Sequence, residues 1–195
     1  MIKAVIFDMD GVLIDTEPLH YRCWKEILKE HYDVEFDYDI YLPCIGSTRQ
    51  FFRDLVKEHY GVDFPDLDEM NRIMKVKKSQ IVKAEGFPEM PGVENALKQL
   101  KEMGYKLAVA SSSPESEIMD AMTRLGLMPY FDSITSGDHV EHPKPEPDTF
   151  LLAAERLNVP TDNCLVIEDS TNGGRAALAA KMDCVWLHNP HSGHQ

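Results

Sequence analysis

Short, continuous apolar runs recur along the chain, and most of them are rich in β-branched residues. Such runs are typical of strands buried on both faces of a parallel sheet, because neither side of the strand meets water. The runs lie at 3–8, 106–111, 164–168 and 184–187, with a weaker one at 133–136. We expect each of them to be a strand.

Runs with apolar residues three and four positions apart lie between these strands. One begins at Pro91 and stops before Gly104, a second begins at Pro114 and stops before Gly126, and a third begins at Pro147. Proline in the first turn and glycine just beyond the last are typical helix boundaries. Strands that alternate with helices predict an α/β fold, a doubly wound parallel sheet with helices on both faces.

One long stretch interrupts this alternation. It contains no convincing strand, but it has amphipathic runs near 19–28, 51–60 and 70–84. A helical stretch directly after the first strand predicts an inserted all-helical cap domain over 16–88, on an α/β core domain made of 1–15 and 89–195. Turn-prone segments at the two junctions are the expected hinges of a cap that moves.

Charge and composition narrow the partners. The 195 residues include 20 Lys+Arg and 33 Asp+Glu, for a formal net charge of −13. An excess of acid this large argues against nucleic acid or an anionic membrane as a partner, since both need clustered positive charge. A small anion remains possible if a metal and a few local cations hold it. We expect a monomer or a weak homo-oligomer.

The chain lacks the marks of an exported or membrane protein. It contains no run of eighteen apolar residues, and its start has no long apolar signal segment. A cytoplasmic location is therefore expected. The four cysteines are far apart and form no C-x-x-C pair, so we expect reduced thiols rather than a zinc site or disulfides.

An acidic pair follows the first predicted strand. The D-x-D spacing occurs at 8/10, 37/39 and 66/68, so the spacing alone means little. Asp8 and Asp10 differ from the other two pairs because they end a buried strand and precede Gly11. Open α/β sheets bind their ligands at this end of the strands. Carboxylates are costly to desolvate there unless something binds them.

Further polar residues stand at equivalent places. Ser111 ends the second strand, Lys144 precedes a proline-rich helix start, and Glu168 and Asp169 end the fourth strand. Because the carboxyl ends of parallel strands meet at one edge of a sheet, we expect these separated segments to converge.

This convergence would create a site for a hard divalent cation, which prefers oxygen ligands. Asp8 and Asp169 suit Mg²⁺ best, and Asp10 and Glu168 are further candidates. Mg²⁺ and Lys144 would return enough positive charge for a phosphate to approach the acidic residues.

The order of these motifs resembles that of the haloacid dehalogenase superfamily, in the branch of β-phosphoglucomutase and small sugar phosphatases. The resemblance covers nearly the whole chain. The matching segments are Asp8-x-Asp10-Gly11-Val12, Ser111, Lys144-Pro145 and Glu168-Asp169-Ser170, followed by Gly173 and Ala176-Ala177.

The resemblance implies a two-step phosphoryl transfer. Asp8 would attack phosphorus to give an aspartyl phosphate, and Asp10 would protonate the leaving oxygen and later activate the acceptor. Ser111 would donate to a phosphoryl oxygen, and Lys144 would neutralise developing charge and hold the nucleophile. Asp169 would bind Mg²⁺ directly.

For the outer part of the site the resemblance implies less. Glu168 would act from outside the metal's own ligands. In the predicted cap, His20 and Arg49 match residues that position the acid/base and grip a second phosphate, and Gly46 matches a close approach to substrate.

Thr16 and Ser112 complete the candidate substrate contacts. Each cap residue also has an ordinary structural role: Thr16 as a helix N-cap, His20 as a packing partner one turn from Trp24, and Arg49 as a surface charge at a helix start.

Two departures separate the chain from the mutases. Ile45 stands where the mutase pattern has lysine, and an asparagine of that pattern is missing near Glu115. We therefore predict a Mg²⁺-dependent phosphatase of a small phosphorylated metabolite, expected to be a sugar phosphate, through an aspartyl-phosphate intermediate. Phosphoryl transfer between sugar hydroxyls, as in β-phosphoglucomutase, is the alternative.

Other classes fit less well. A phospho-acceptor receiver module also combines acidic residues, a hydroxyl and a lysine. It places its acidic pair after the first strand and has no large helical insert, whereas here Glu168 and Asp169 come late in the chain. A dinucleotide-binding domain would need a glycine-rich phosphate loop, which the chain lacks. Dehalogenation is disfavoured because a halide leaving group needs no proton from Asp10.

The C-terminal end raises two expectations. Family members usually continue into one more strand and helix, so we expect either a shortened chain or an uncovered sheet edge. His188, His191 and His194 have a spacing that a transition metal could use, but a polar terminus is the simpler interpretation.

Overall fold

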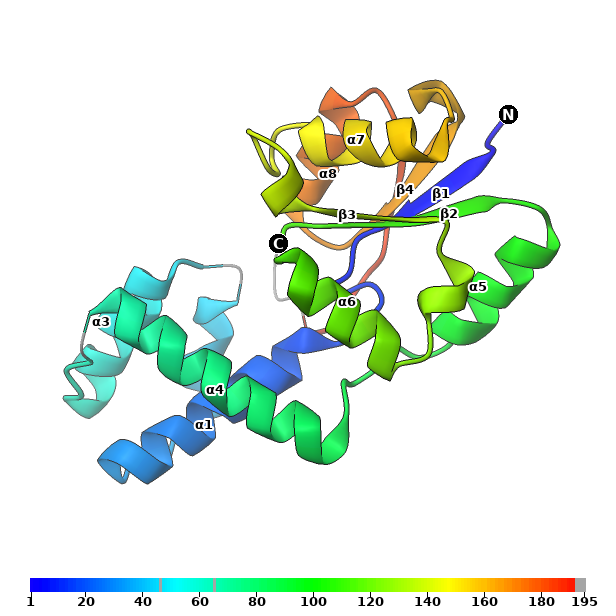
Figure 1. Cartoon of the computed structure of the whole chain (residues 1–195). Helices are drawn as coiled ribbons and strands as arrows, with labels where there is room; N and C mark the ends of the chain where they lie inside the picture. Colours follow the sequence, from blue (N-terminus) through cyan, green and yellow to red (C-terminus); the bar gives the residue numbers. More distant parts are fainter. Residues whose placement is uncertain (46, 65, 192–195) are drawn as a thin grey trace. The chain divides into compact units, whose positions relative to one another are not determined.

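The computed structural model describes residues 1–45, 47–64 and 66–191. These residues divide into two units, which are shown in Figure 1. The first, here called the α/β unit, combines Met1–Asp15 with Phe87–Asn189. The second, the helical unit, consists of Thr16–Gly86 and the described part of the tail from Pro190.

A five-stranded parallel sheet forms the α/β unit, in the order β3-β2-β1-β4-β5. The strands are β1 (Ala4–Phe7), β2 (Lys106–Ser111), β3 (Ser133–Ser136), β4 (Cys164–Glu168) and β5 (Asp183–Trp186). The first strand lies at the centre, where Ala4 is opposite Lys106 on one side and Cys164 on the other. The predicted parallel sheet is thereby confirmed.

Helices cover both faces of this sheet (Figure 1). They are α5 (Val93–Glu102), α6 (Glu115–Arg124), α7 (Asp148–Leu157) and α8 (Thr171–Ala179). Residues alternate between the faces along β1: Ala4 and Ile6 pack with α7 and α8, whereas Val5 and Phe7 pack with α5 and α6. Burial on both faces explains why the strand is continuously apolar. The doubly wound fold class is confirmed.

Three short 3₁₀ turns occur between the later elements of the α/β unit. They are η2 (Met128–Tyr130), η3 (Gly137–His139) and η4 (Thr161–Asn163). The second of them begins directly after β3, at the same end of the sheet as Ser111. It therefore lies close to the loop that follows β2.

The helical unit is built around aromatic packing. Its elements are α1 (Thr16–Tyr32), α2 (Tyr38–Tyr41), η1 (Leu42–Cys44), α3 (Arg49–Tyr60) and α4 (Leu67–Glu85). The Trp24 ring lies 4.4 Å from Phe52 and 5.8 Å from Phe64, centroid to centroid. These contacts join α1 to α3 and to the segment before α4. They stabilise the unit, because large aromatic rings bury much apolar surface.

The chain leaves and re-enters the α/β unit through two adjacent segments. The Asp15 amide donates to the Pro88 carbonyl at 2.8 Å, and the Met90 amide donates to the Leu13 carbonyl at 3.0 Å. Residues near both junctions are therefore held by backbone hydrogen bonds. Within the described part of the chain, no helix combines the length and apolar character needed to cross a membrane.

Candidate active site

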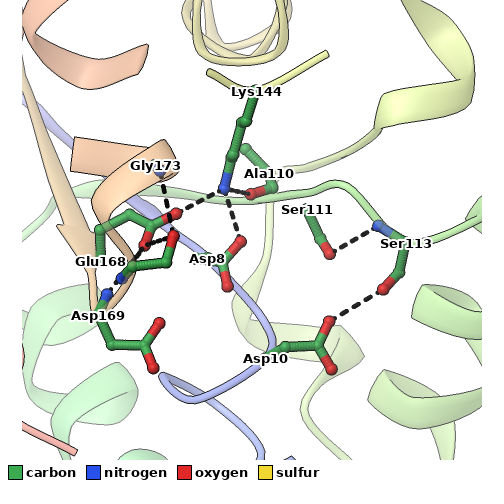
Figure 2. Close-up of polar contacts among 10 residues, drawn as sticks. Asp8, Asp10, Ala110, Ser111, Ser113, Lys144, Glu168, Asp169 and Gly173 are labelled. Carbon is green, nitrogen blue, oxygen red and sulfur yellow. Dashed lines mark hydrogen bonds and ion pairs between the residues drawn. The ribbon is translucent and has the colours of Figure 1, made fainter. Parts of the chain in front are cut away.

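Polar side chains gather at the carboxyl ends of the central strands (Figure 2). Asp8 comes directly after β1, Ser111 is the last residue of β2, and Glu168 is the last residue of β4. Lys144 reaches the same place from the segment between η3 and α7. All three strand-end side chains are buried, as is the Lys144 side chain, which is 4% exposed.

Lys144 joins two of the predicted site residues. Its Nζ donates to Asp8 Oδ1 at 2.6 Å, to Glu168 Oε1 at 2.9 Å and to the Ala110 carbonyl at 3.0 Å. The same ammonium lies 4.5 Å from the centre of the Phe150 ring. Three acceptors and an aromatic face are a complete set of partners for a buried ammonium. Lys144 is therefore fixed in place.

Burial and charge act in opposite directions on this pair. Burial raises the pKa of Asp8 to about 8, and Glu168 and Asp10 add to the rise while Lys144 opposes it. Burial lowers the pKa of Lys144, but Asp8 and Glu168 outweigh it and hold that pKa above its ordinary value. Full ionisation of Asp8 at neutral pH therefore requires positive charge beyond that of Lys144.

Both oxygens of the Glu168 carboxylate accept hydrogen bonds. Its Oε2 accepts from the amides of Asp169 and Ser170 at 2.9 and 2.8 Å, and from Ser170 Oγ at 3.0 Å, while Oε1 accepts from Lys144. A Cβ on Gly173 would lie 1.6 Å from Glu168 Oε1. Glycine at position 173 thus makes room for this carboxylate, which orients the start of α8.

Three carboxylates can offer oxygen atoms to one cation. Ligand atoms of Asp8, Glu168 and Asp169 lie within 4.8 Å of one another. Gly11 has a φ of +81°, and a Cβ there would lie 1.9 Å from Asp169 Oδ2, so the turn leaves space for this side chain. When all three carboxylates are ionised, as cation binding requires, the Lys144 ammonium leaves two negative charges uncompensated. An oxygen-only donor set with that charge fits Mg²⁺.

Asp10 has different partners from the other acids. Its Oδ2 accepts a hydrogen bond from Ser113 Oγ at 2.9 Å, and the Ser113 amide donates to Ser111 Oγ at 3.1 Å (Figure 2). The contacts of its carboxylate are thus with the loop after β2. Since Ser111 Oγ accepts from this amide, its own proton remains available for another acceptor. From the sequence, Ser113 was expected only at a helix start, within a run of three serines after a predicted strand, and no site role was predicted for it.

His20 and Arg49 lie in the helical unit, among cationic groups. Burial lowers the pKa of His20 to about 3, and Lys78 and Arg49 lower it further. The Arg49 guanidinium lies 5.3 Å from the centre of the Trp24 ring, and its Nε donates to Asn71 Oδ1 at 3.3 Å. Burial also lowers the pKa of Arg49. At neutral pH, His20 is thus an uncharged imidazole.

The remaining candidates are less informative. Thr16 is buried at the first position of α1, and Ser112 is exposed in the loop after β2. Gly46 lies outside the described residues, as does His194. Among the described residues, His188 and His191 belong to no group that could hold a metal ion.

Comparison with known proteins shows the family to which the chain belongs. The family model described as "Haloacid dehalogenase-like hydrolase" matches residues 5–187. The phosphorylated carbohydrates phosphatase of Thermotoga maritima is 35% identical over 195 residues, which cover 98% of this chain and 88% of that protein. The fructose-1-phosphate phosphatase of Escherichia coli is 35% identical over 184 residues, covering 93% of this chain and 94% of that protein.

A solved structure shows that the similarity extends to the fold. It is a Thermotoga maritima protein described as a candidate β-phosphoglucomutase, with a TM-score of 0.82 and 34% sequence identity. The match covers 96% of this chain and 86% of that one. The resemblance inferred from the four motifs is therefore confirmed at the level of sequence and of fold.

Proposed function

Because the chain belongs to the haloacid dehalogenase-like hydrolase family, we propose that this enzyme is a phosphatase of small phosphorylated carbohydrates. The observation that carries the proposal is the Asp8–Lys144 contact at the end of β1, beside two further buried carboxylates. The activities of the two phosphatase relatives supply the substrate class.

Asp8 and Asp169 are the residues that would hold Mg²⁺. Glu168 fits a supporting role better, since its oxygens already accept hydrogen bonds from Lys144 and from the start of α8. When bound, Mg²⁺ supplies positive charge that lets a phosphate dianion approach these acids. The Asp10 carboxylate instead serves in proton transfer.

Asp8 is the proposed nucleophile. Lys144 donates to its Oδ1, which leaves Oδ2 as the attacking atom. A bond forms between Oδ2 and phosphorus while the bond from phosphorus to the sugar oxygen breaks, and Asp10 gives that oxygen its proton. The Ser111 hydroxyl donates a hydrogen bond to a phosphoryl oxygen. The products are the free sugar and an aspartyl phosphate.

The second step returns the enzyme to its starting state. Asp10, now ionised, accepts a proton from water as the water oxygen bonds to phosphorus. The bond between phosphorus and Asp8 breaks, and inorganic phosphate leaves. Both steps use the same two carboxylates, which divide one difficult displacement into two easier ones.

Most of the proposed substrate contacts belong to the helical unit. Thr16, His20 and Arg49 belong to it, and Gly46 and Ser112 complete the set. The roles of His20, Arg49 and Gly46 rest on the resemblance to the mutases, and Thr16 and Ser112 remain candidate contacts. A neutral His20 suits a hydrogen-bonding role better than a charge-pairing one.

Transfer between sugar hydroxyls is the second candidate, because the matched Thermotoga maritima structure is described as a candidate β-phosphoglucomutase. Ile45 and Glu115 depart from the mutase pattern, which favours water as the acceptor. Incubation with β-glucose 1-phosphate separates the two: a phosphatase releases inorganic phosphate, whereas a mutase yields glucose 6-phosphate.

A substrate screen tests the proposal. The intact chain is incubated with Mg²⁺ and a panel of phosphorylated metabolites, and phosphate release is measured for the unmodified enzyme, Asp8→Asn and Asp162→Asn. Asp162 is exposed in η4, so its variant controls for the loss of one acid. We expect sugar phosphates to be hydrolysed and only Asp8→Asn to be inactive. Full turnover by Asp8→Asn would refute the proposed nucleophile.

A further inference from the structure

We propose that Ser113 is the positioning residue for the acid/base Asp10. The backbone carbonyl of Ser113 in turn accepts a hydrogen bond from Ser136. This inference rests on the proposed function and deepens it. Asp10 and Ser113 are 103 residues apart in the sequence, and neither composition nor motif order connects them.

The contact selects one oxygen of Asp10 for proton transfer. Ser113 Oγ donates to Oδ2 at 2.9 Å, so that oxygen is occupied as an acceptor. A proton on the Asp10 carboxyl then resides on Oδ1, which becomes the atom that gives and takes it. This hydrogen bond restricts rotation of the Asp10 carboxyl group about its Cβ–Cγ bond. Asp10 therefore presents the same oxygen atom in both chemical steps.

Ser113 is itself anchored by a buried residue. Ser136, the last residue of β3, is fully buried, and its Oγ donates to the Ser113 carbonyl at 2.7 Å. The same Oγ accepts from the Asp138 amide at 3.0 Å. The hydroxyl of Ser136 therefore uses its donor and one acceptor position to tie η3 to the loop after β2.

Two further contacts restrain that junction. The Ser136 amide donates to His139 Nδ1 at 3.1 Å, which closes a capping box over η3. A Cβ on Gly137 would lie 3.2 Å from the Ser112 carbonyl oxygen, so the two backbones pack closely. The loop that carries Ser113 is thus held by β3 and η3.

The leaving group distinguishes positioning from binding. A sugar phosphate releases an alkoxide, which needs a proton as the bond breaks, whereas p-nitrophenyl phosphate releases a stable phenolate that does not. A residue that acts through Asp10 therefore affects the sugar phosphate far more. A residue that binds the phosphoryl group affects both substrates alike.

The experiment compares kcat/KM for both substrates, since this ratio covers the steps up to transfer onto Asp8. Variants are Ser113→Ala, Ser113→Thr and Ser136→Ala, with Ser133→Ala at the opposite end of β3 as control. We expect Ser113→Ala to lose about tenfold or more on the sugar phosphate and no more than about twofold on p-nitrophenyl phosphate. Ser113→Thr keeps the hydroxyl and restores the sugar-phosphate rate.

Ser136→Ala is expected to show the same substrate-dependent pattern with a smaller loss, and Ser133→Ala no change. Equal losses on both substrates in Ser113→Ala, or no rescue by Ser113→Thr, would overturn the positioning role and leave the phosphatase intact. A different result, in which the unmodified enzyme hydrolyses neither substrate, would remove the proposed function and with it the role of Ser113.

Discussion

Lys144 places its ammonium 2.6 Å from the Asp8 carboxylate, across 136 residues of sequence. Both side chains are removed from solvent, with 4% and 11% of their side-chain surface exposed. An ion pair this deeply buried is costly to form, and it persists when each partner has further hydrogen bonds. Lys144 has them in Glu168 and the Ala110 carbonyl. The pair links the proposed nucleophile to the other acids of the site.

Replacement of this ammonium is expected to impair both folding and turnover. Lys144→Met keeps the length of the side chain but leaves Asp8 and Glu168 without a counter-charge, which costs about 3–5 kcal/mol in comparable buried pairs. Urea denaturation measures the change in unfolding free energy. The control is Lys101→Met, which breaks a half-exposed pair with Asp132 and is expected to cost at most about 1 kcal/mol. Equal costs for the two variants would contradict this prediction.

Mg²⁺ is expected to stabilise the folded chain through Asp169. A ligand at 100 times its Kd raises the unfolding free energy by about 2.7 kcal/mol, so the melting temperature should rise with Mg²⁺ and fall back with a chelator. Asp169→Asn should lose most of that rise, and Asp162→Asn should keep it. A rise of the same size in Asp169→Asn would place the cation elsewhere.

Gly11 offers a test of the acidic turn. Gly11→Ala combines a left-handed backbone with a Cβ that would overlap Asp169 Oδ2. Gly104 has a φ of +85° but open space around its Cβ position, so Gly104→Ala isolates the backbone strain, about 1–2 kcal/mol. We expect Gly11→Ala to be the less stable variant in thermal melts and to lose phosphatase activity. Activity at the unmodified level in Gly11→Ala would show that Asp169 can move without effect.

His20 should make stability depend on pH. Its pKa is about 3 in the folded chain against 6.5 when unfolded, so the unfolded state binds more protons between these values. Its contribution is complete above pH 6.5 and is lost as the pH falls toward 3. At pH 5 the loss is up to about 2 kcal/mol, because each pKa unit corresponds to about 1.36 kcal/mol.

The measurement is urea denaturation of the unmodified chain and of His20→Asn at pH 7 and pH 5. His20→Asn lacks the titrating imidazole and should lose less stability over that interval. A matched control, His59→Asn, removes a histidine near the end of α3 and should behave like the unmodified chain. Parallel losses in all three proteins would contradict the prediction for His20.

The sequence predicted the strands well because their burial leaves a strong local signal. The runs at 106–111 and 164–168 coincide with β2 and β4, since a strand covered on both faces is largely apolar. The weaker run at 133–136 coincides with β3, which lies at the edge of the sheet. The short helix α2 and the turn η1 escaped prediction. Four residues such as Tyr38–Tyr41 carry too little periodicity to be recognised.

The site was only partly accessible to the same reasoning. Asp8, Lys144 and Glu168 were predicted to meet because topology brings the ends of parallel strands together. Sequence order cannot indicate which oxygen of a carboxylate is engaged, nor that Ser113 contacts Asp10. Such contacts depend on the conformation of loops after the strands, which composition does not determine.

Transfer of the phosphoryl group to Asp8 is tested most directly by trapping it. The enzyme is mixed with Mg²⁺ and its best sugar phosphate, quenched in acid within one turnover, digested and analysed by mass spectrometry. We expect one phosphoryl group on the peptide that contains Asp8, removed by hydroxylamine, and none in Asp8→Asn. Phosphate release without any such adduct, or an adduct on another residue, would contradict the proposed mechanism.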